Sequence, residues 1–183
     1  MFKKLFAVLI ALLMLCSCAV EEHSEPIAPE DRPRRLALSH DAILTLNEAC
    51  RNEGLTLAVE NLPRTCLCNR SAEMIELLKD TGVSVCFDFN HSLDEDNAAF
   101  LTALIDSGLP IATVHISDYD RIDERHRLPG DGCNDWKQLL GILEAADYSG
   151  PLMYEIARKP YQREEIPLQQ LAANMRELRA GRI

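Results

Sequence analysis

The sequence predicts an α/β fold built on a parallel sheet, and three observations support this prediction. Four short apolar segments rich in β-branched residues recur along the chain, at 55–61, 83–89, 111–117 and 151–157. Helical patterns with one apolar face lie between them. The four segments are apolar almost throughout, which is typical of strands that a parallel sheet buries on both faces.

Chain length limits how large such a fold can be. The chain has 183 residues, whereas a complete barrel of eight strand–helix units typically needs about 250. We therefore expect part of such a barrel and not a whole one.

The first segment, residues 1–18, is typical of a bacterial lipoprotein signal peptide. Two lysines precede an apolar run from Leu5 to Leu15, which has the length of a signal-peptide core. The four residues that end at Cys18 resemble a lipobox, in which that cysteine carries the acyl chains that anchor the protein to the membrane. A simple secretory signal is the alternative. We expect an exported lipoprotein that faces the periplasm or the cell surface.

Residues 19–33 are acidic and contain three prolines, so we expect a flexible tether.

The folded domain is then 34–183. Its first helix precedes four strand–helix units, and a glycine stands just before each strand, at Gly54, Gly82, Gly108 and Gly150. These glycines suit the left-handed residue that ends a helix. The apolar positions that define the helices are Leu36, Ile43, Leu46 and Cys50; Met74, Leu77 and Leu78; Phe100, Leu101, Leu104 and Ile105; Trp136, Leu139, Leu140 and Leu143; and Leu168, Leu171, Met175 and Leu178.

Polar residues stand at the carboxyl end of each predicted strand: Glu60, Asp88, His115 and Glu155. In a parallel sheet these ends lie side by side, on the edge where active sites form. Three carboxylates that meet there repel one another unless a cation is present. Oxygen ligands with one histidine suit manganese, magnesium or zinc. Taken singly, each residue also has an ordinary structural interpretation, such as a loop cap or a hydrogen-bonded core histidine.

From about residue 34 onward, the motifs resemble the xylose isomerase-like barrels of the sugar phosphate isomerase and epimerase superfamily. AVENLP resembles the fifth strand, with Glu60 as a metal ligand. CFDFNH resembles its Asp-x-x-His motif, with Asp88 as ligand and His91 reaching substrate. VHISDYDR resembles the seventh strand, with ligand His115 and with Arg121 holding a substrate oxygen. LPGDGCNDW and YSGPLMYEI resemble the last loop and the eighth strand with Glu155. The resemblance implies a partial (β/α)8 TIM barrel: strands five to eight with their helices, and one preceding helix.

The resemblance also implies an activity. We expect a divalent-metal-dependent sugar or sugar phosphate isomerase or epimerase that moves a proton through an enediolate. Glu60, Asp88, His115 and Glu155 would hold the metal, with Mn2+ expected first and Mg2+, Co2+ or Zn2+ as alternatives. Glu60 and Glu155 would be the acid/base pair.

Two other functions fit part of the pattern. Apurinic endonucleases share the barrel but need further ligands in an Asp-x-His arrangement; here DRIDERHR places Asp123 and His126 three apart. A net charge of −10 also disfavours nucleic acid as a partner.

The other function is an inactive lipid-anchored sugar-binding or remnant module. A half barrel has open sheet edges, so we expect a homodimer or a partner chain to cover them.

Overall fold

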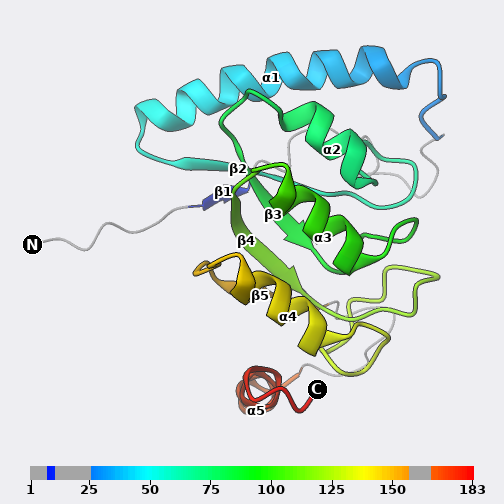
Figure 1. The fold of residues 1–183 in the computed structure, drawn as a ribbon, viewed down its shortest axis with the longest axis vertical. Coiled ribbons are helices and arrows are strands. Elements are labelled where there is room, and N and C mark those ends of the chain that lie inside the picture. The colour runs from blue at the N-terminus through cyan, green and yellow to red at the C-terminus, as the bar shows by residue number, and fades with distance from the viewer. Residues whose placement is uncertain (1–7, 11–25, 157–165) are drawn as a thin grey trace, which may run out of the picture.

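The structure is a computed structural model that describes residues 8–10, 26–156 and 166–183. These residues form one parallel sheet with the strand order β1-β2-β3-β4-β5 (Figure 1). The strands are β1 (Val8–Ile10), β2 (Thr56–Glu60), β3 (Ser84–Asp88), β4 (Ile111–Ile116) and β5 (Leu152–Tyr154). The helices are α1 (Arg32–Asn52), α2 (Ser71–Leu78), α3 (Asn97–Asp106), α4 (Trp136–Ala145) and α5 (Leu168–Arg179).

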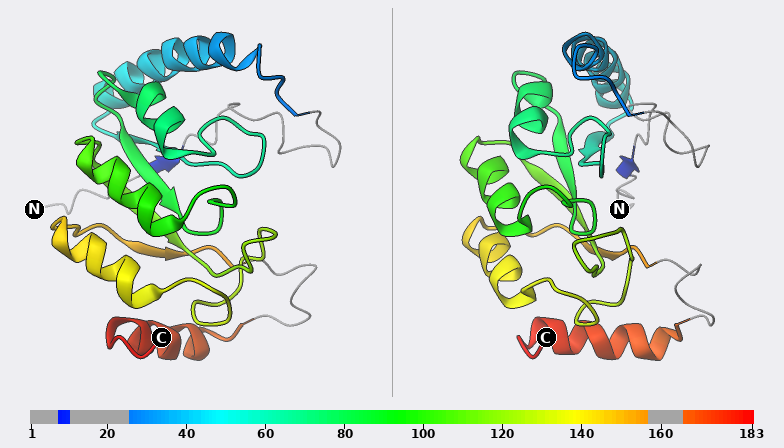
Figure 2. Two further views of the ribbon diagram at one scale, coloured as in Figure 1. Left: turned by 45° about the vertical axis from the view of Figure 1, so that its right-hand side comes forward. Right: turned by 90° about the vertical axis from the view of Figure 1, so that its right-hand side faces the viewer.

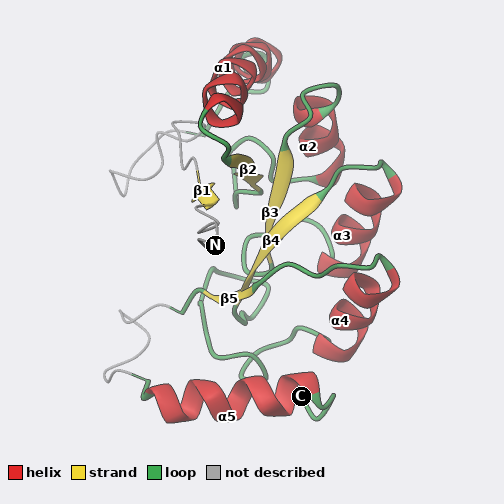
Figure 3. Cartoon of the chain, turned by 90° about the vertical axis from the view of Figure 1, so that its left-hand side faces the viewer, coloured by secondary structure: helices red, strands yellow, loops and turns green. Residues whose placement is uncertain are grey.

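Helices and strands alternate, and the helices cover one face of the sheet. Figure 3 shows α2, α3 and α4 side by side along that face, and Figure 2 shows the same layering from two other directions. The helix α1 lies beyond β2, and α5 lies at the opposite end of the row of elements. This arrangement confirms the α/β prediction and is consistent with part of a (β/α)8 barrel.

Aromatic side chains fill the layer between the sheet and the helices. Phe87 on β3 lies edge-on to Phe100 on α3, with ring centroids 5.3 Å apart, and Phe89 packs in the same way on Trp136 of α4. Side chains alternate along a strand. Because Phe87 faces the helices, Cys86 and Asp88 face the other side of the sheet. Packing the aromatic residues therefore decides which side of β3 carries its polar residues.

The strand β1 was not expected from the sequence. It pairs in parallel with β2, Val8 opposite Thr56, inside the segment interpreted as a signal peptide. An apolar run fits a buried strand as well as it fits a signal-peptide core, so the residues alone do not separate the two. The signal peptide itself stays a prediction, and Cys18 lies outside the described residues. None of the described helices is long and apolar enough to cross a membrane.

One of the four predicted helix-ending glycines has a different role. Gly54, Gly82 and Gly108 have the expected left-handed φ of 69°, 66° and 80°, but before β5 this conformation belongs to Asp147, with φ 54°. At Gly150 a Cβ atom would lie 2.6 Å from the carbonyl oxygen of Ala112. Gly150 is therefore required by close approach of two backbones.

The loop between β4 and α4 is fixed by a buried carboxylate. Asp118 is fully buried and accepts hydrogen bonds from Gly130 N at 2.9 Å, Asn134 N at 3.1 Å and Trp136 Nε1 at 2.9 Å. It also pairs through its backbone with Arg127. These bonds hold residues 118–134 beside the carboxyl ends of the strands.

Candidate metal centre

The four predicted ligands, Glu60, Asp88, His115 and Glu155, come together in the structure. One potential ligand atom from each lies within 4.8 Å of the others. Nδ1 of His115 is 3.1 Å from Glu60 Oε1, 3.5 Å from Asp88 Oδ2 and 2.5 Å from Glu155 Oε2. The imidazole thus lies among three carboxylates that come from three different strand ends.

A register shift brings two of these residues opposite each other. Between Val85 and Cys86 the pairing of β3 with β4 slips by one residue, so that Asp88 becomes the direct partner of His115. Such bulges re-aim side chains and are common next to active sites. Sequence spacing alone does not reveal this shift.

Burial and charge perturb the pKa values of the cluster. Burial raises the pKa of Glu60, and the neighbouring Asp88 carboxylate adds to this. Burial also favours neutral Asp88, but the charge of His91 and the neighbouring His115 imidazole outweigh it and hold the Asp88 pKa well below its usual range. Burial lowers the pKa of His115, yet the groups around it, first of all Asp88, raise it strongly. The imidazolium therefore supplies the positive charge that these carboxylates require.

The residues fit a divalent cation. Asp88 Oδ2 and Glu155 Oε2 are buried oxygens without a hydrogen-bond partner among the described residues, although both lie close to His115 Nδ1. Buried polar atoms are normally paired, so two orphaned acceptors that face the same point indicate room for a cation. Three carboxylates with one imidazole suit Mn2+, Mg2+ or Zn2+.

The two predicted substrate residues lie in different places. His91 is buried beside the cluster, with Nδ1 3.6 Å from Glu60 Oε1 and 3.9 Å from Asp88 Oδ2. Arg121 instead donates to Asp96 at 2.7 Å, and its side chain is 52% exposed. Asp96 caps the first turn of α3. The structure therefore brings His91 to the four ligands and holds Arg121 at the start of α3; a substrate role for either stays a prediction.

Asn61 braces the centre and was given no role from the sequence. Its Oδ1 accepts from Asp88 N at 2.7 Å, and its Nδ2 donates to Asp88 O at 3.0 Å. Its own carbonyl oxygen lies 2.9 Å from His91 Nδ1. Asn61 thus orients two site residues, Asp88 through its side-chain amide and His91 through its backbone carbonyl. Its position directly after Glu60 is the signal that points to it.

A known protein family matches most of the chain. The family model for the xylose isomerase-like TIM barrel matches residues 9–180. The chain belongs to the xylose isomerase-like TIM barrel family. The match starts well before residue 34, where the sequence motifs begin, so it does not restrict the family resemblance to the carboxyl-terminal half.

Similar solved structures of this family include several epimerases. A D-tagatose 3-epimerase-like protein is 20% identical with a TM-score of 0.71, over 84% of this chain and 56% of its own. The 3-keto-D-glucoside 4-epimerase from E. coli is 25% identical with a TM-score of 0.64, over 84% and 56%. Among proteins similar in sequence, an uncharacterized protein of Methanocaldococcus jannaschii is 27% identical over 59% of this chain and 39% of its own length. The chain thus spans little more than half of these solved structures.

In this family member the loop after β4 adds a second group of potential ligands. One atom each from His91, Glu124 and His126 lies within 4.8 Å of the others, and the rings of His91 and His126 are 5.6 Å apart. Glu124 is held by an ion pair with Arg64 at 2.7 Å. The sequence pattern pairs Asp123 with His126, whereas the structure brings Glu124 to His126. The Glu-x-His spacing of Glu124 and His126 is the sequence signal that could have indicated this second group of potential ligands.

Cys86 is a further neighbour of the centre, and the sequence motifs give it no role. Its Sγ atom lies 3.4 Å from His115 Nε2, and burial raises the pKa of its thiol. It stands two residues before Asp88 and so shares a sheet face with it.

A cavity of about 1090 Å³ lies elsewhere, beside Pro110, Tyr148 and Pro151, and none of the four ligands lines it. The chemistry of the side chains therefore locates the candidate site better than the size of a cavity does.

Proposed function

We propose that the chain is a divalent-metal-dependent sugar or sugar phosphate isomerase or epimerase. The observation that carries this proposal is the meeting of Glu60, Asp88, His115 and Glu155 at the carboxyl ends of β2, β3, β4 and β5. The family and the epimerases among its solved relatives support it. We also propose that these four strands correspond to strands five to eight of the barrel, and that Mn2+ is the preferred ion.

The chemistry requires a base, an acid and a positive charge. A cation held by the four ligands would polarise the sugar carbonyl and its neighbouring hydroxyl. One glutamate, Glu60 or Glu155, removes the proton from the adjacent carbon, and the C–H electron pair forms the enediolate. The other glutamate returns a proton to the opposite side of that carbon, so the sugar is neither oxidised nor reduced. His91 orients the sugar oxygens from beside the centre, and Arg121 does so once its loop contacts substrate.

Exchange of a carbon-bound proton tests this proposal directly. The full chain is stripped of metal, reloaded with Mn2+ and incubated with D-fructose and other keto sugars in D2O. We expect epimer formation with deuterium at the reacting carbon, measured by NMR. Glu60→Gln and Glu155→Gln should each lower the rate by about 10²–10⁴-fold, because each removes an acid/base group.

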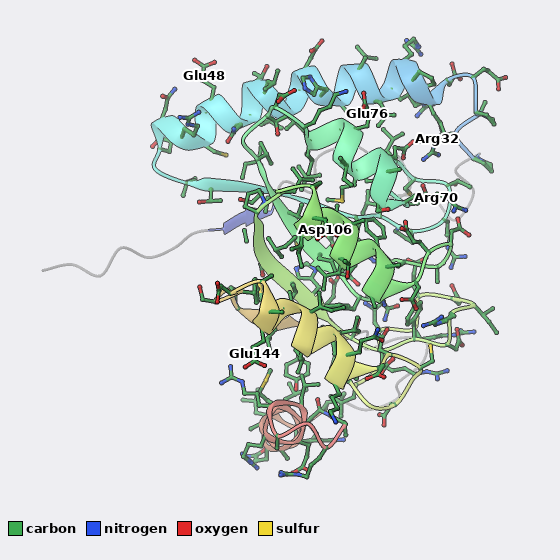
Figure 4. All side chains as sticks on the ribbon, in the orientation of Figure 1. Arg32, Glu48, Arg70, Glu76, Asp106 and Glu144 are labelled. Atoms are coloured by element: carbon green, nitrogen blue, oxygen red, sulfur yellow. The ribbon has the colours of Figure 1, made fainter. Side chains whose placement is uncertain are left out.

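The matched control is Glu76→Gln, an exposed glutamate on α2 (Figure 4) that pairs with Lys79 of the same segment; it should retain full activity. Unchanged activity in both site variants would contradict the proposal. A chain that binds Mn2+ but exchanges no proton on any sugar would instead be the inactive sugar-binding module.

A second candidate function is a metal-dependent nuclease similar to the apurinic endonucleases. The group formed by His91, Glu124 and His126 favours it, because that activity requires ligands beyond the first four. Cleavage of DNA that contains an abasic site, with added zinc, separates it from sugar chemistry.

We further propose that the chain is an exported lipoprotein anchored through Cys18, on the basis of the apolar run and the lipobox-like residues before it. Metabolic labelling with an alkyne fatty acid should mark the wild-type chain in bacterial membranes and leave Cys18→Ala unlabelled. Label that persists in Cys18→Ala would refute the anchor.

A further inference from the structure

We propose that Cys86 positions the metal ligand His115 by accepting a hydrogen bond from its Nε2–H group. The inference rests on the metal centre proposed above and deepens it. The Sγ atom of Cys86 lies 3.4 Å from His115 Nε2, which is hydrogen-bond distance for sulfur. Neither the sequence motifs nor the comparisons with known proteins give this cysteine a role.

The two nitrogens of His115 have different neighbours. Nδ1 lies near Glu60, Asp88 and Glu155, whereas Nε2 lies near Cys86. A neutral imidazole carries one N–H and one lone pair, and it binds a metal through the lone pair. If Nδ1 is to face the cation, the proton must be on Nε2. An acceptor at Nε2 therefore selects the tautomer that binds.

The sheet holds this acceptor in place. Cys86 pairs with Glu60 on β2 and with Thr113 on β4, two residues before His115. It is fully buried, and His115 is 7% exposed, so bulk water has little access to Nε2. An N–H that loses its partner in such a place stays unsatisfied. Ligand histidines commonly donate their second N–H to a fixed acceptor, and loss of that acceptor typically weakens metal binding 10–100-fold.

A different role for Cys86 would be direct coordination, because Glu60, Cys86 and His115 also offer ligand atoms within 4.8 Å of one another. The geometry favours the positioning role: the three carboxylates gather at Nδ1, and the sulfur lies at the other nitrogen. The two roles differ spectroscopically, since a thiolate bound to Co2+ gives an intense charge-transfer absorption that carboxylate and imidazole ligands do not give.

Two variants that differ by one oxygen atom test the proposal. Cys86→Ser keeps an acceptor, and Cys86→Ala removes it. Calorimetry with Mn2+ on the full chain should show binding close to wild type for Cys86→Ser and 10–100-fold weaker binding for Cys86→Ala. In the metal-free chain, the Nε2–H signal of His115 should exchange slowly with water in the wild type and in Cys86→Ser, and rapidly in Cys86→Ala. Urea unfolding of each metal-free variant checks the fold.

Several results would overturn the proposal: wild-type Mn2+ affinity in Cys86→Ala, equal losses in both variants, or a cobalt–thiolate band in the wild type. If the wild type binds no metal, the proposed function fails, while the Nε2–H signal still decides whether Cys86 holds His115. If Cys86→Ala does not fold, the isosteric pair Cys86→Thr and Cys86→Val provides the same comparison.

Discussion

At the scale of single residues, the centre is organised around His115. Its imidazole lies among three carboxylates, and its raised pKa keeps it charged in the metal-free chain because those carboxylates outweigh the effect of burial. A divalent cation would replace this internal positive charge, so metal binding releases a proton from the imidazole. The carboxylates thus face a positive charge in either state, which explains how buried Glu60 and Asp88 can lie beside the partly exposed Glu155.

Asp88→Asn is expected to remove metal binding without unfolding the chain. Asparagine is isosteric and keeps an acceptor for Asn90 N, which donates to Asp88 Oδ1, but it loses the anionic ligand. With Mn2+ at about 100 times its dissociation constant, the wild-type melting temperature should rise by roughly 5–10 °C. Thermal unfolding of Asp88→Asn should show no such rise.

Asp106→Asn is the matched control, since Asp106 is exposed on α3 and points away from the sheet. It should keep the full metal-dependent shift. An equal shift in Asp88→Asn would mean that the ion binds elsewhere.

At the scale of elements, the strands β2 to β5 and the described helices could be predicted from the sequence, whereas β1 and the irregular loops could not. Four strands and five helices can be predicted from the spacing of apolar residues, because burying one face of a strand or helix imposes that spacing. The register shift at Val85 and Cys86 and the loop that brings Glu124 and His126 to His91 depend on long-range contacts. The same holds for Arg121, which Asp96 holds at α3. The ligands were predictable because each ends a regular strand, whereas Glu124 and His126 belong to a loop whose path is set by Asp118.

Two glycines near α4 should respond in opposite ways to alanine. At Gly132 a Cβ would lie 2.3 Å from Asp118 Oδ1 and 2.4 Å from Tyr119 O, so Gly132→Ala must displace the loop and should destabilise the chain by about 1–3 kcal/mol. Gly141 lies inside α4 with no atom within 4 Å of its would-be Cβ. Gly141→Ala should stabilise by about 0.5–1 kcal/mol. Urea unfolding measures both, and equal effects would show that the Asp118 contacts do not constrain the loop.

At the scale of the whole molecule, we expect the outer strands of the described sheet to determine how chains meet. The outer strands β1 and β5 have three residues each, against five or six for the inner strands. An edge strand with an open side can pair with a strand of another chain, but a short edge strand limits this pairing. We therefore expect a discrete dimer and no open-ended aggregate. Light scattering after size-exclusion chromatography of the full, uncleaved chain, in which β1 is present, should give twice its 20.6 kDa; a monomer mass, or a mass that grows steadily with concentration, would contradict this.

Net charge favours the sugar enzyme over the nuclease. The chain carries −10, and a DNA-binding protein normally gains affinity by neutralising phosphates with Lys and Arg. Even with the second ligand group present, the overall field repels the duplex before its backbone can reach His91 and His126. We therefore expect no binding and no cleavage of abasic-site DNA at physiological salt, with or without Zn2+, measured by gel shift and strand-scission assays. Zinc-dependent cleavage that is lost in His126→Ala would reverse this conclusion and make the second ligand group part of a nuclease centre.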